Sequence, residues 1–184
     1  MFFRFLLDLF QLILSPRRGW EDIAIDNIPA RRLLVCGFVP SILLTAATAL
    51  LSAAYHFETS IIVAIEQVIA CVVKYLASYY LASFFFSLYI PSCTGGELSL
   101  RKNHTFIIYS LSLLLLFNLL GNCLPMFPDM LHMLPIYVLF VMWRGIGYME
   151  VKFDGVIGFM VLCLTTVILP PFLLQYLFNI VIAN

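Results

Sequence analysis

Apolar residues form long, nearly unbroken runs that are separated by short polar connections along the whole chain. Roughly 20 apolar residues are enough for a helix to cross the hydrocarbon core of a bilayer. Five runs meet this requirement, at residues 33–54, 61–90, 105–124, 134–151 and 156–178. The pattern therefore predicts an all-α integral membrane protein with five transmembrane helices.

The first residues have a different pattern, in which a narrow polar stripe interrupts an otherwise apolar sequence. At 100° per residue, a helix over residues 2–14 gathers its polar side chains within an arc of about 60°. A helix of this kind is expected to lie in the cytoplasmic leaflet, parallel to the membrane surface. Pro16 should end it, because proline disfavours helix in the preceding residue. The stripe consists of Arg4, Asp8, Gln11 and Ser15.

The stretch "SPRRGWEDIAIDNIP" joins this helix to the first predicted span. Arg17 and Arg18 suit anionic headgroups, and Trp20 suits the membrane interface, where tryptophan is enriched. We therefore expect a strap along the membrane surface. The predicted organisation is an N-terminal amphipathic segment, residues 1–30, followed by one membrane domain, residues 31–184.

Composition agrees with a membrane protein. Hydrophobic residues make up 63% of the 184 residues and charged residues 11%, whereas soluble domains average about 45–50% and about 25%. The net charge of zero excludes a generally basic nucleic-acid binder. The expected partners are the lipid bilayer, through anionic headgroups at the cytoplasmic face, and either another membrane protein or further copies of this chain.

The basic residues are distributed unevenly between the predicted connections. Nine of the ten Lys and Arg residues lie before the first span or in alternate connections, and the tenth, Lys74, lies inside a span. Because positive charge is retained on the cytoplasmic side, the N-terminus is expected inside and the C-terminus outside. We expect the protein in the inner cell membrane.

Several short motifs occur in a recognisable order. "SPRRGWEDI", with Pro16, Trp20 and Ile23, precedes the first span, and "FIIYS", with Tyr109, begins the third. The others are the "GG" pair at 95–96, the proline-rich turn at 124–135, and "YVLFVMWRGIGYM", with Tyr137 and Gly145. In this order the motifs resemble the Yip-domain family, Ypt/Rab-interacting membrane proteins with five spans, in its bacterial form.

The resemblance implies a five-helix Yip-like membrane domain and a role in organising or docking other membrane components. The chain departs from the family pattern after Tyr109, where no proline follows, so a kink is not implied there. Eukaryotic members bind Rab GTPases through a longer hydrophilic N-terminal region. Only about 30 residues precede the first predicted span here, so the resemblance does not imply Rab binding.

Ionisable residues within predicted spans are candidate functional residues. An unpaired lysine at the middle of a span costs about 2.5–3.5 kcal/mol on insertion, so Lys74 should face protein or water. With Glu66 on the same span and Arg144 near the end of the fourth, it forms a candidate intramembrane polar site. These residues either line an ion or proton path or make structural contacts between helices.

Enzyme motifs are absent from the sequence, so we expect no catalytic activity and no cofactor. His56, Glu58, Asp129 and His132 have no recognised metal spacing, so no metal site is expected either. Two functional hypotheses follow. The first is a non-enzymatic membrane protein that organises or docks other components. The alternative is a small transporter, channel or lipid-handling protein that uses Lys74 and Glu66.

Overall fold

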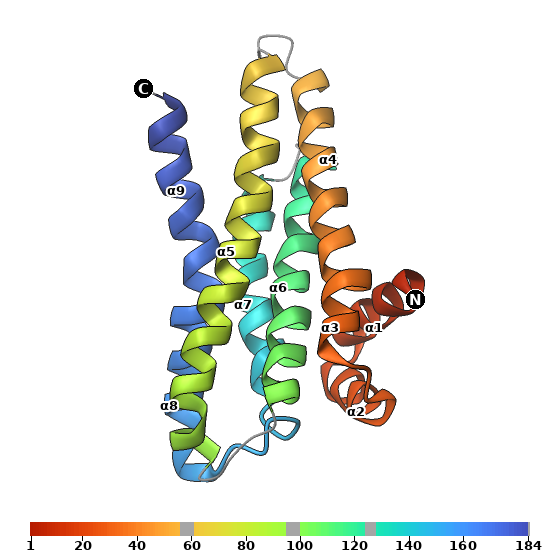
Figure 1. Cartoon of the computed structure of the whole chain (residues 1–184), viewed down its shortest axis with the longest axis vertical. Coiled ribbons are helices and arrows are strands. Elements are labelled where there is room, and N and C mark those ends of the chain that lie inside the picture. The colour runs from red at the N-terminus through yellow and green to blue at the C-terminus, as the bar shows by residue number, and fades with distance from the viewer. Residues whose placement is uncertain (56–60, 95–99, 124–127, 184) are drawn as a thin grey trace.

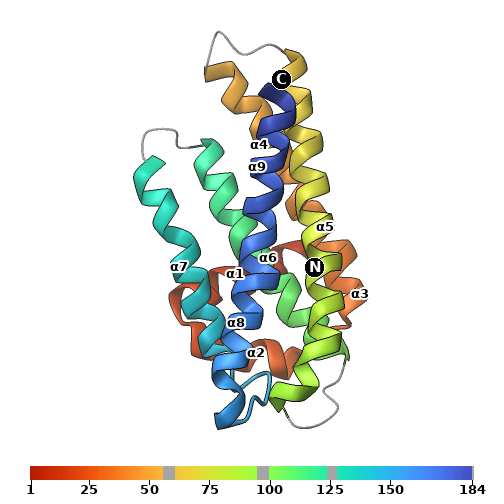
Figure 2. The ribbon, with the colours of Figure 1, turned by 90° about the vertical axis from the view of Figure 1, so that its left-hand side faces the viewer.

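The computed structural model describes residues 1–55, 61–94, 100–123 and 128–183. These residues are almost entirely helical, and none of them forms a strand. Long helices stand side by side in a bundle, and a pair of short N-terminal helices packs against the side of its lower half (Figures 1 and 2). The α-helices are α1 (Phe2–Leu14), α2 (Pro16–Asp26), α3 (Ala30–Leu33), α4 (Val39–Tyr55), α5 (Ile61–Thr94), α6 (Leu100–Cys123), α7 (Pro128–Arg144), α8 (Val156–Cys163) and α9 (Leu169–Ala183).

Four helical stretches of the described chain are long and apolar enough to cross a membrane, which confirms a multi-pass membrane protein in outline. Two of them join consecutive helices, since α3 continues into α4 and α8 continues into α9. The four stretches are Ala30–Leu50, Ile62–Thr94, Leu100–Cys123 and Phe153–Ile180.

The fourth predicted span is shorter than expected. Its apolar helix covers Leu134–Arg144 in the structure, and the chain then turns instead of continuing as helix to residue 151. Two glycines, Gly145 and Gly147, lie in this turn, and Glu150 adopts a left-handed backbone conformation with φ 52°. Both features are typical of chain reversal rather than helix.

Two π-helical segments interrupt the long helices, and each lies just before a proline. Leu34–Phe38 precedes Pro40, and Leu164–Ile168 precedes Pro170. Proline has no N–H and its ring displaces the carbonyl four residues earlier, so the preceding turn widens. The second widened turn thus lies directly before the Pro170–Pro171 pair of α9. In contrast, α6 runs without interruption past Tyr109.

The N-terminal helix has the predicted bounds, residues 2–14, and Pro16 begins the next helix. Two residues of its polar stripe contact α2. Arg4 forms an ion pair with Asp26, and the Gln11 amide bonds to Asp22. Because Arg4 in the first turn of α1 pairs with Asp26, the last residue of α2, the two helices form an antiparallel hairpin. One exposed face of α1 is apolar and consists of Phe3, Leu7, Phe10 and Leu14.

The α1–α2 hairpin is fastened to the bundle by three aromatic residues. Trp20 was expected at the membrane interface, but it is only 2% exposed and donates from Nε1 to the Val141 carbonyl at 3.0 Å. The Tyr109 hydroxyl donates to Asp8 Oδ2 at 2.7 Å, and the Tyr137 hydroxyl donates to the Ile13 carbonyl. Trp20 is thus a core residue, because its ring packs between helices that the sequence alone does not place together.

Gly145 provides the space for the Trp20 ring. A Cβ atom at this position would lie 2.7 Å from Phe106 Cε2 and 3.0 Å from Trp20 Cε2. We therefore expect Gly145→Ala to lower the free energy of unfolding by about 1–3 kcal/mol, the usual cost of overpacking. Gly147→Ala is the matched control, since a Cβ there has no neighbour within 4 Å. Thermal unfolding in detergent measures both variants, and equal losses would contradict this packing.

Asp8 is expected to make the stability of the contact between the hairpin and the bundle depend on pH. Partial burial raises the pKa of its carboxyl above the ordinary 3.8; the Tyr109 hydrogen bond opposes this shift. A carboxyl whose pKa is raised on folding contributes stability that is complete below about pH 4 and declines as pH rises through the folded pKa. Asp8→Asn keeps an acceptor for Tyr109 and removes the charge. We expect a melting temperature at pH 7 equal to or above that of the wild type, and an advantage that shrinks towards pH 4.

The two ends of the bundle differ in charge. The α2 helix, the end of α5, the start of α6, the end of α7 and the start of α8 gather at the lower end in Figure 1. Most of the basic residues occur on or beside these elements, and this end is called the basic end below. The C-terminus lies at the opposite end (Figure 1).

Candidate functional site

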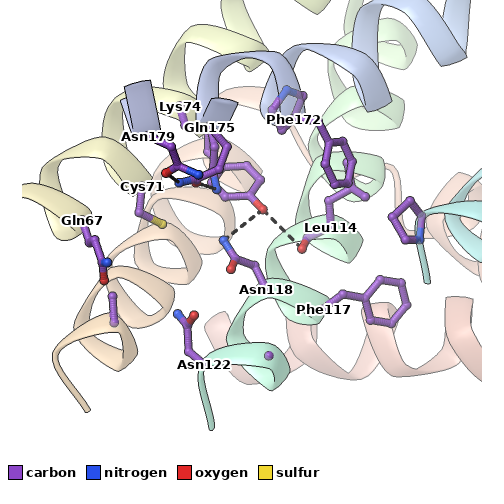
Figure 3. A pocket seen from close by; sticks show the side chains of 15 residues that line it. Gln67, Cys71, Lys74, Leu114, Phe117, Asn118, Asn122, Phe172, Gln175 and Asn179 are labelled. Carbon is purple, nitrogen blue, oxygen red and sulfur yellow. Dashed lines mark hydrogen bonds between the residues drawn. The ribbon is translucent and has the colours of Figure 1, made fainter. Parts of the chain in front are cut away.

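A cavity of about 510 Å³ lies between the long helices, in the half of the bundle that is farther from the basic end. Residues from α4, α5, α6, α7 and α9 line it, and its polar side chains point inward (Figure 3). The lining residues are Ala49, Gln67, Cys71, Lys74, Tyr75, Leu114, Phe117, Asn118, Gly121, Asn122, Pro135, Pro171, Phe172, Gln175 and Asn179.

Lys74 provides the charge of this cavity. Its side chain comes from the middle of α5 and is only 6% exposed. The ammonium donates to Gln175 Oε1 at 2.7 Å and lies 4.9 Å from the centre of the Tyr75 ring. The Gln175 amide in turn donates to Asn179 Oδ1 at 2.9 Å. Within the described ranges, no carboxylate forms an ion pair with Lys74.

Amide groups from α6 and the Tyr75 hydroxyl of α5 form another polar part of the cavity wall. Asn118 donates to the Tyr75 hydroxyl at 3.4 Å, and that hydroxyl donates to the Leu114 carbonyl at 3.3 Å (Figure 3). Asn122 donates to Thr48 Oγ1 at 3.2 Å. The polar residues of α6 thus contact the neighbouring helices α4 and α5, as helix-facing asparagines in a membrane protein are expected to do.

The remaining wall is apolar. Phe117 and Pro135 lie on one side of the cavity, and Pro171 and Phe172 of α9 lie on the other. Helix α7 leans away from α9 towards the opposite end of the bundle (Figure 2). The cavity therefore combines one charged and amide-rich surface with apolar surface contributed by α6, α7 and α9.

The electrostatics of this arrangement favour an anion. A lysine removed from water loses hydration that one neutral amide and one aromatic ring replace only in part. Low dielectric surroundings also strengthen the attraction between the ammonium and any opposite charge that enters. A carboxylate or phosphate in the cavity would meet the Lys74 ammonium and amide N–H donors, which are the groups that bind anions in proteins.

The structure separates the three residues of the predicted intramembrane site. Lys74 lines the cavity, but Glu66 is exposed on α5 and is not among the lining residues. Arg144 ends α7 at the basic end, with its guanidinium carbon 5.2 Å from the Phe140 ring centre and 5.8 Å from that of Trp143. The structure therefore does not bring Glu66, Lys74 and Arg144 together at one cavity.

Sequence reasoning missed the partners of Lys74 on the last helix. Gln175 and Asn179 are four residues apart, so they lie on one face of α9. Two amides at this spacing in an apolar span were the available signal. Their distance of about 100 residues from Lys74 along the chain left no local pattern to connect them.

No family model, curated protein or solved structure matches this chain. The resemblance to the Yip-domain family therefore stays a prediction. Three residues that carry the resemblance have a common structural role, because Trp20, Tyr109 and Tyr137 all fasten the α1–α2 hairpin. Residues 95–96, which also carry it, lie outside the described residues, as do His56 and Glu58.

Proposed function

We propose that this chain is a membrane protein that binds the anionic head of an amphiphile in the cavity around Lys74. The observation that carries the proposal is a buried ammonium that bonds to a neutral amide instead of a carboxylate. Keeping such a charge in a membrane segment is costly. A ligand that arrives with a negative charge would offset this cost.

The apolar wall supports an amphiphile rather than a small ion. A cavity of about 510 Å³ is within the range of ligand sites, about 300–1,000 Å³, and far exceeds what one small anion fills. The head would contact Lys74, Gln175 and Asn118, and the chain would lie against Phe117 and Phe172. This is the lipid-handling form of the second functional hypothesis. It keeps Lys74 as a binding residue and no longer includes Glu66.

We also propose that the basic end is cytoplasmic and that α7 is a fifth, short span. The distribution of Lys and Arg supports the orientation, and the placement of α1 and the C-terminus at different heights of the bundle agrees with an odd number of spans (Figure 1). The apolar exposed face of α1 supports its location in the cytoplasmic leaflet. The docking hypothesis rests on the family resemblance alone.

Thermal unfolding of the detergent-purified protein against a small panel of ligands tests the binding proposal. Phosphatidylglycerol and a long-chain fatty acid should raise the melting temperature, while phosphatidylcholine should not. At a hundred times the dissociation constant a bound ligand adds about 2.7 kcal/mol, which corresponds to about 5–10 °C.

Two further arms identify the source of the effect. A shift produced equally by inorganic phosphate would show that the cavity binds a small anion and would contradict the amphiphile. At the same ligand concentration the shift should be at most about half as large in Lys74→Met. A shift of unchanged size in this variant, or no shift with any anion, would contradict binding at Lys74.

A further inference from the structure

A second concave surface lies at the basic end, far from the Lys74 cavity. It is a groove of about 780 Å³ between α2, the end of α7, the turn that follows it, and the start of α8. We call it the arginine groove because Arg17 and Arg144 both line it, one from each side. The groove is also lined by Glu21, Trp143 and Phe153.

We propose that the arginine groove binds the headgroup of an anionic phospholipid from the leaflet at the basic end. Arg144 forms no ion pair in the described part of the chain, and its guanidinium packs beside aromatic rings. Such packing fixes the plane of the guanidinium and leaves N–H groups free to bond a phosphate in bidentate geometry.

Arg17 adds a second cation to the same groove. Its Nε bonds to Glu21 Oε1 at 3.3 Å, which occupies one of the five donors of the guanidinium and leaves the others for a ligand. Glu21 is the carboxylate that lines the groove, so the two arginines give it a net positive charge. A net negative head is therefore favoured over a zwitterionic one.

Apolar side chains beside the arginines select a lipid rather than a soluble phosphate. Phe153 is 94% exposed and Trp143 is 51% exposed, and both line the groove. Next to them, Ile157 on α8 is 79% exposed. Large apolar residues this exposed on a membrane protein face acyl chains, so a phosphate held by the arginines would continue directly into its own chains along this surface.

Fluorescence quenching by brominated lipids tests the proposal on the whole protein. The chain contains two tryptophans, Trp20 and Trp143, and only Trp143 is accessible. The protein is reconstituted in phosphatidylcholine vesicles that contain either dibrominated phosphatidylglycerol or dibrominated phosphatidylcholine. The Trp143→Phe variant gives the background from Trp20.

We expect phosphatidylglycerol to quench Trp143 with an apparent affinity about five-fold higher than phosphatidylcholine for each arginine engaged. Arg144→Gln and Arg17→Gln should each reduce this preference by that factor. Arg18→Gln is the matched control, since it removes the same charge from α2 outside the groove, and Lys74→Met should leave the preference unchanged.

Two results would overturn the proposal. One is equal quenching by the two lipids in the wild type. The other is a loss in Arg18→Gln as large as the loss in Arg144→Gln, which would show general attraction to a charged surface instead of a site. An unchanged melting temperature in each variant excludes unfolding as the cause of a lost preference.

Discussion

Replacing Lys74 by methionine should weaken binding of an anionic amphiphile and leave the protein folded, with a melting temperature at or above that of the wild type. Methionine has nearly the same length and volume as lysine and carries no charge. The substitution removes an insertion cost of about 2.5–3.5 kcal/mol. Gln175 loses a donor but keeps its bond to Asn179, so the loss on the protein side is small.

The weaker binding follows from the removal of one charge-assisted hydrogen bond. Bonds to charged groups contribute about 1.5–3 kcal/mol, so the dissociation constant should rise about ten- to a hundred-fold. Lys102→Met is the matched control, because Lys102 forms an exposed ion pair with Glu150 at the basic end. Isothermal titration with phosphatidylglycerol in detergent measures both variants.

Unfolding of Lys74→Met would contradict this account of the cavity. It would mean that the ammonium has a buried acidic partner, from another subunit or from outside the described ranges, because leaving such a partner unpaired costs about 3–5 kcal/mol. Unchanged affinity in a stable variant would place the ligand elsewhere.

Replacing Trp20 by alanine should release the α1–α2 hairpin from the bundle. The Trp20 ring stacks on Phe106 and Tyr148, with centroids 5.0 and 5.2 Å away, and donates to the Val141 carbonyl. Truncation of a buried tryptophan costs about 3–5 kcal/mol. The hydrogen bonds from Tyr109 and Tyr137 hold α1 and not α2, so we expect the loss of Trp20 to appear as local detachment.

Hydrogen exchange followed by mass spectrometry measures the detachment. Amides in residues 2–26 should exchange faster in Trp20→Ala, while α5 and α6 keep their protection. Trp143→Ala is the matched control, because Trp143 is half exposed at the end of α7 and should alter exchange far less. A uniform increase in exchange along the whole chain would contradict local detachment of the hairpin.

Most of the secondary structure could be predicted from the sequence, because apolar length and proline positions are local signals. Residues 2–14, the break at Pro16 and the long helices α5 and α6 all follow from them. The end of α7 did not, since Arg144 and the glycines after it interrupt an apolar run only weakly. The hydropathy of residues 145–151 gave no indication of the turn.

The orientation of side chains was harder to predict than the helices. The polar stripe of α1 suggested contact with water, yet Arg4 and Gln11 bond to α2, and a neighbouring apolar face of α1 is exposed. Tryptophan is typical of the membrane interface, but Trp20 is buried in the protein core. Lys74 could be identified from the sequence because a lysine in a membrane span has a high insertion cost. Its partner Gln175 could not be identified, because only the packing of α9 on α5 brings the two residues together.

Native mass spectrometry of the intact protein tests the central claim most directly. Wild type and Lys74→Met are released from nanodiscs that contain phosphatidylcholine with a minor fraction of phosphatidylglycerol, and the retained lipid is identified by its mass. The arginine groove is intact in both, so its lipid serves as an internal reference. The account predicts that the wild type retains one more anionic lipid than Lys74→Met. Identical lipid counts in the two proteins would show that Lys74 holds no anionic amphiphile.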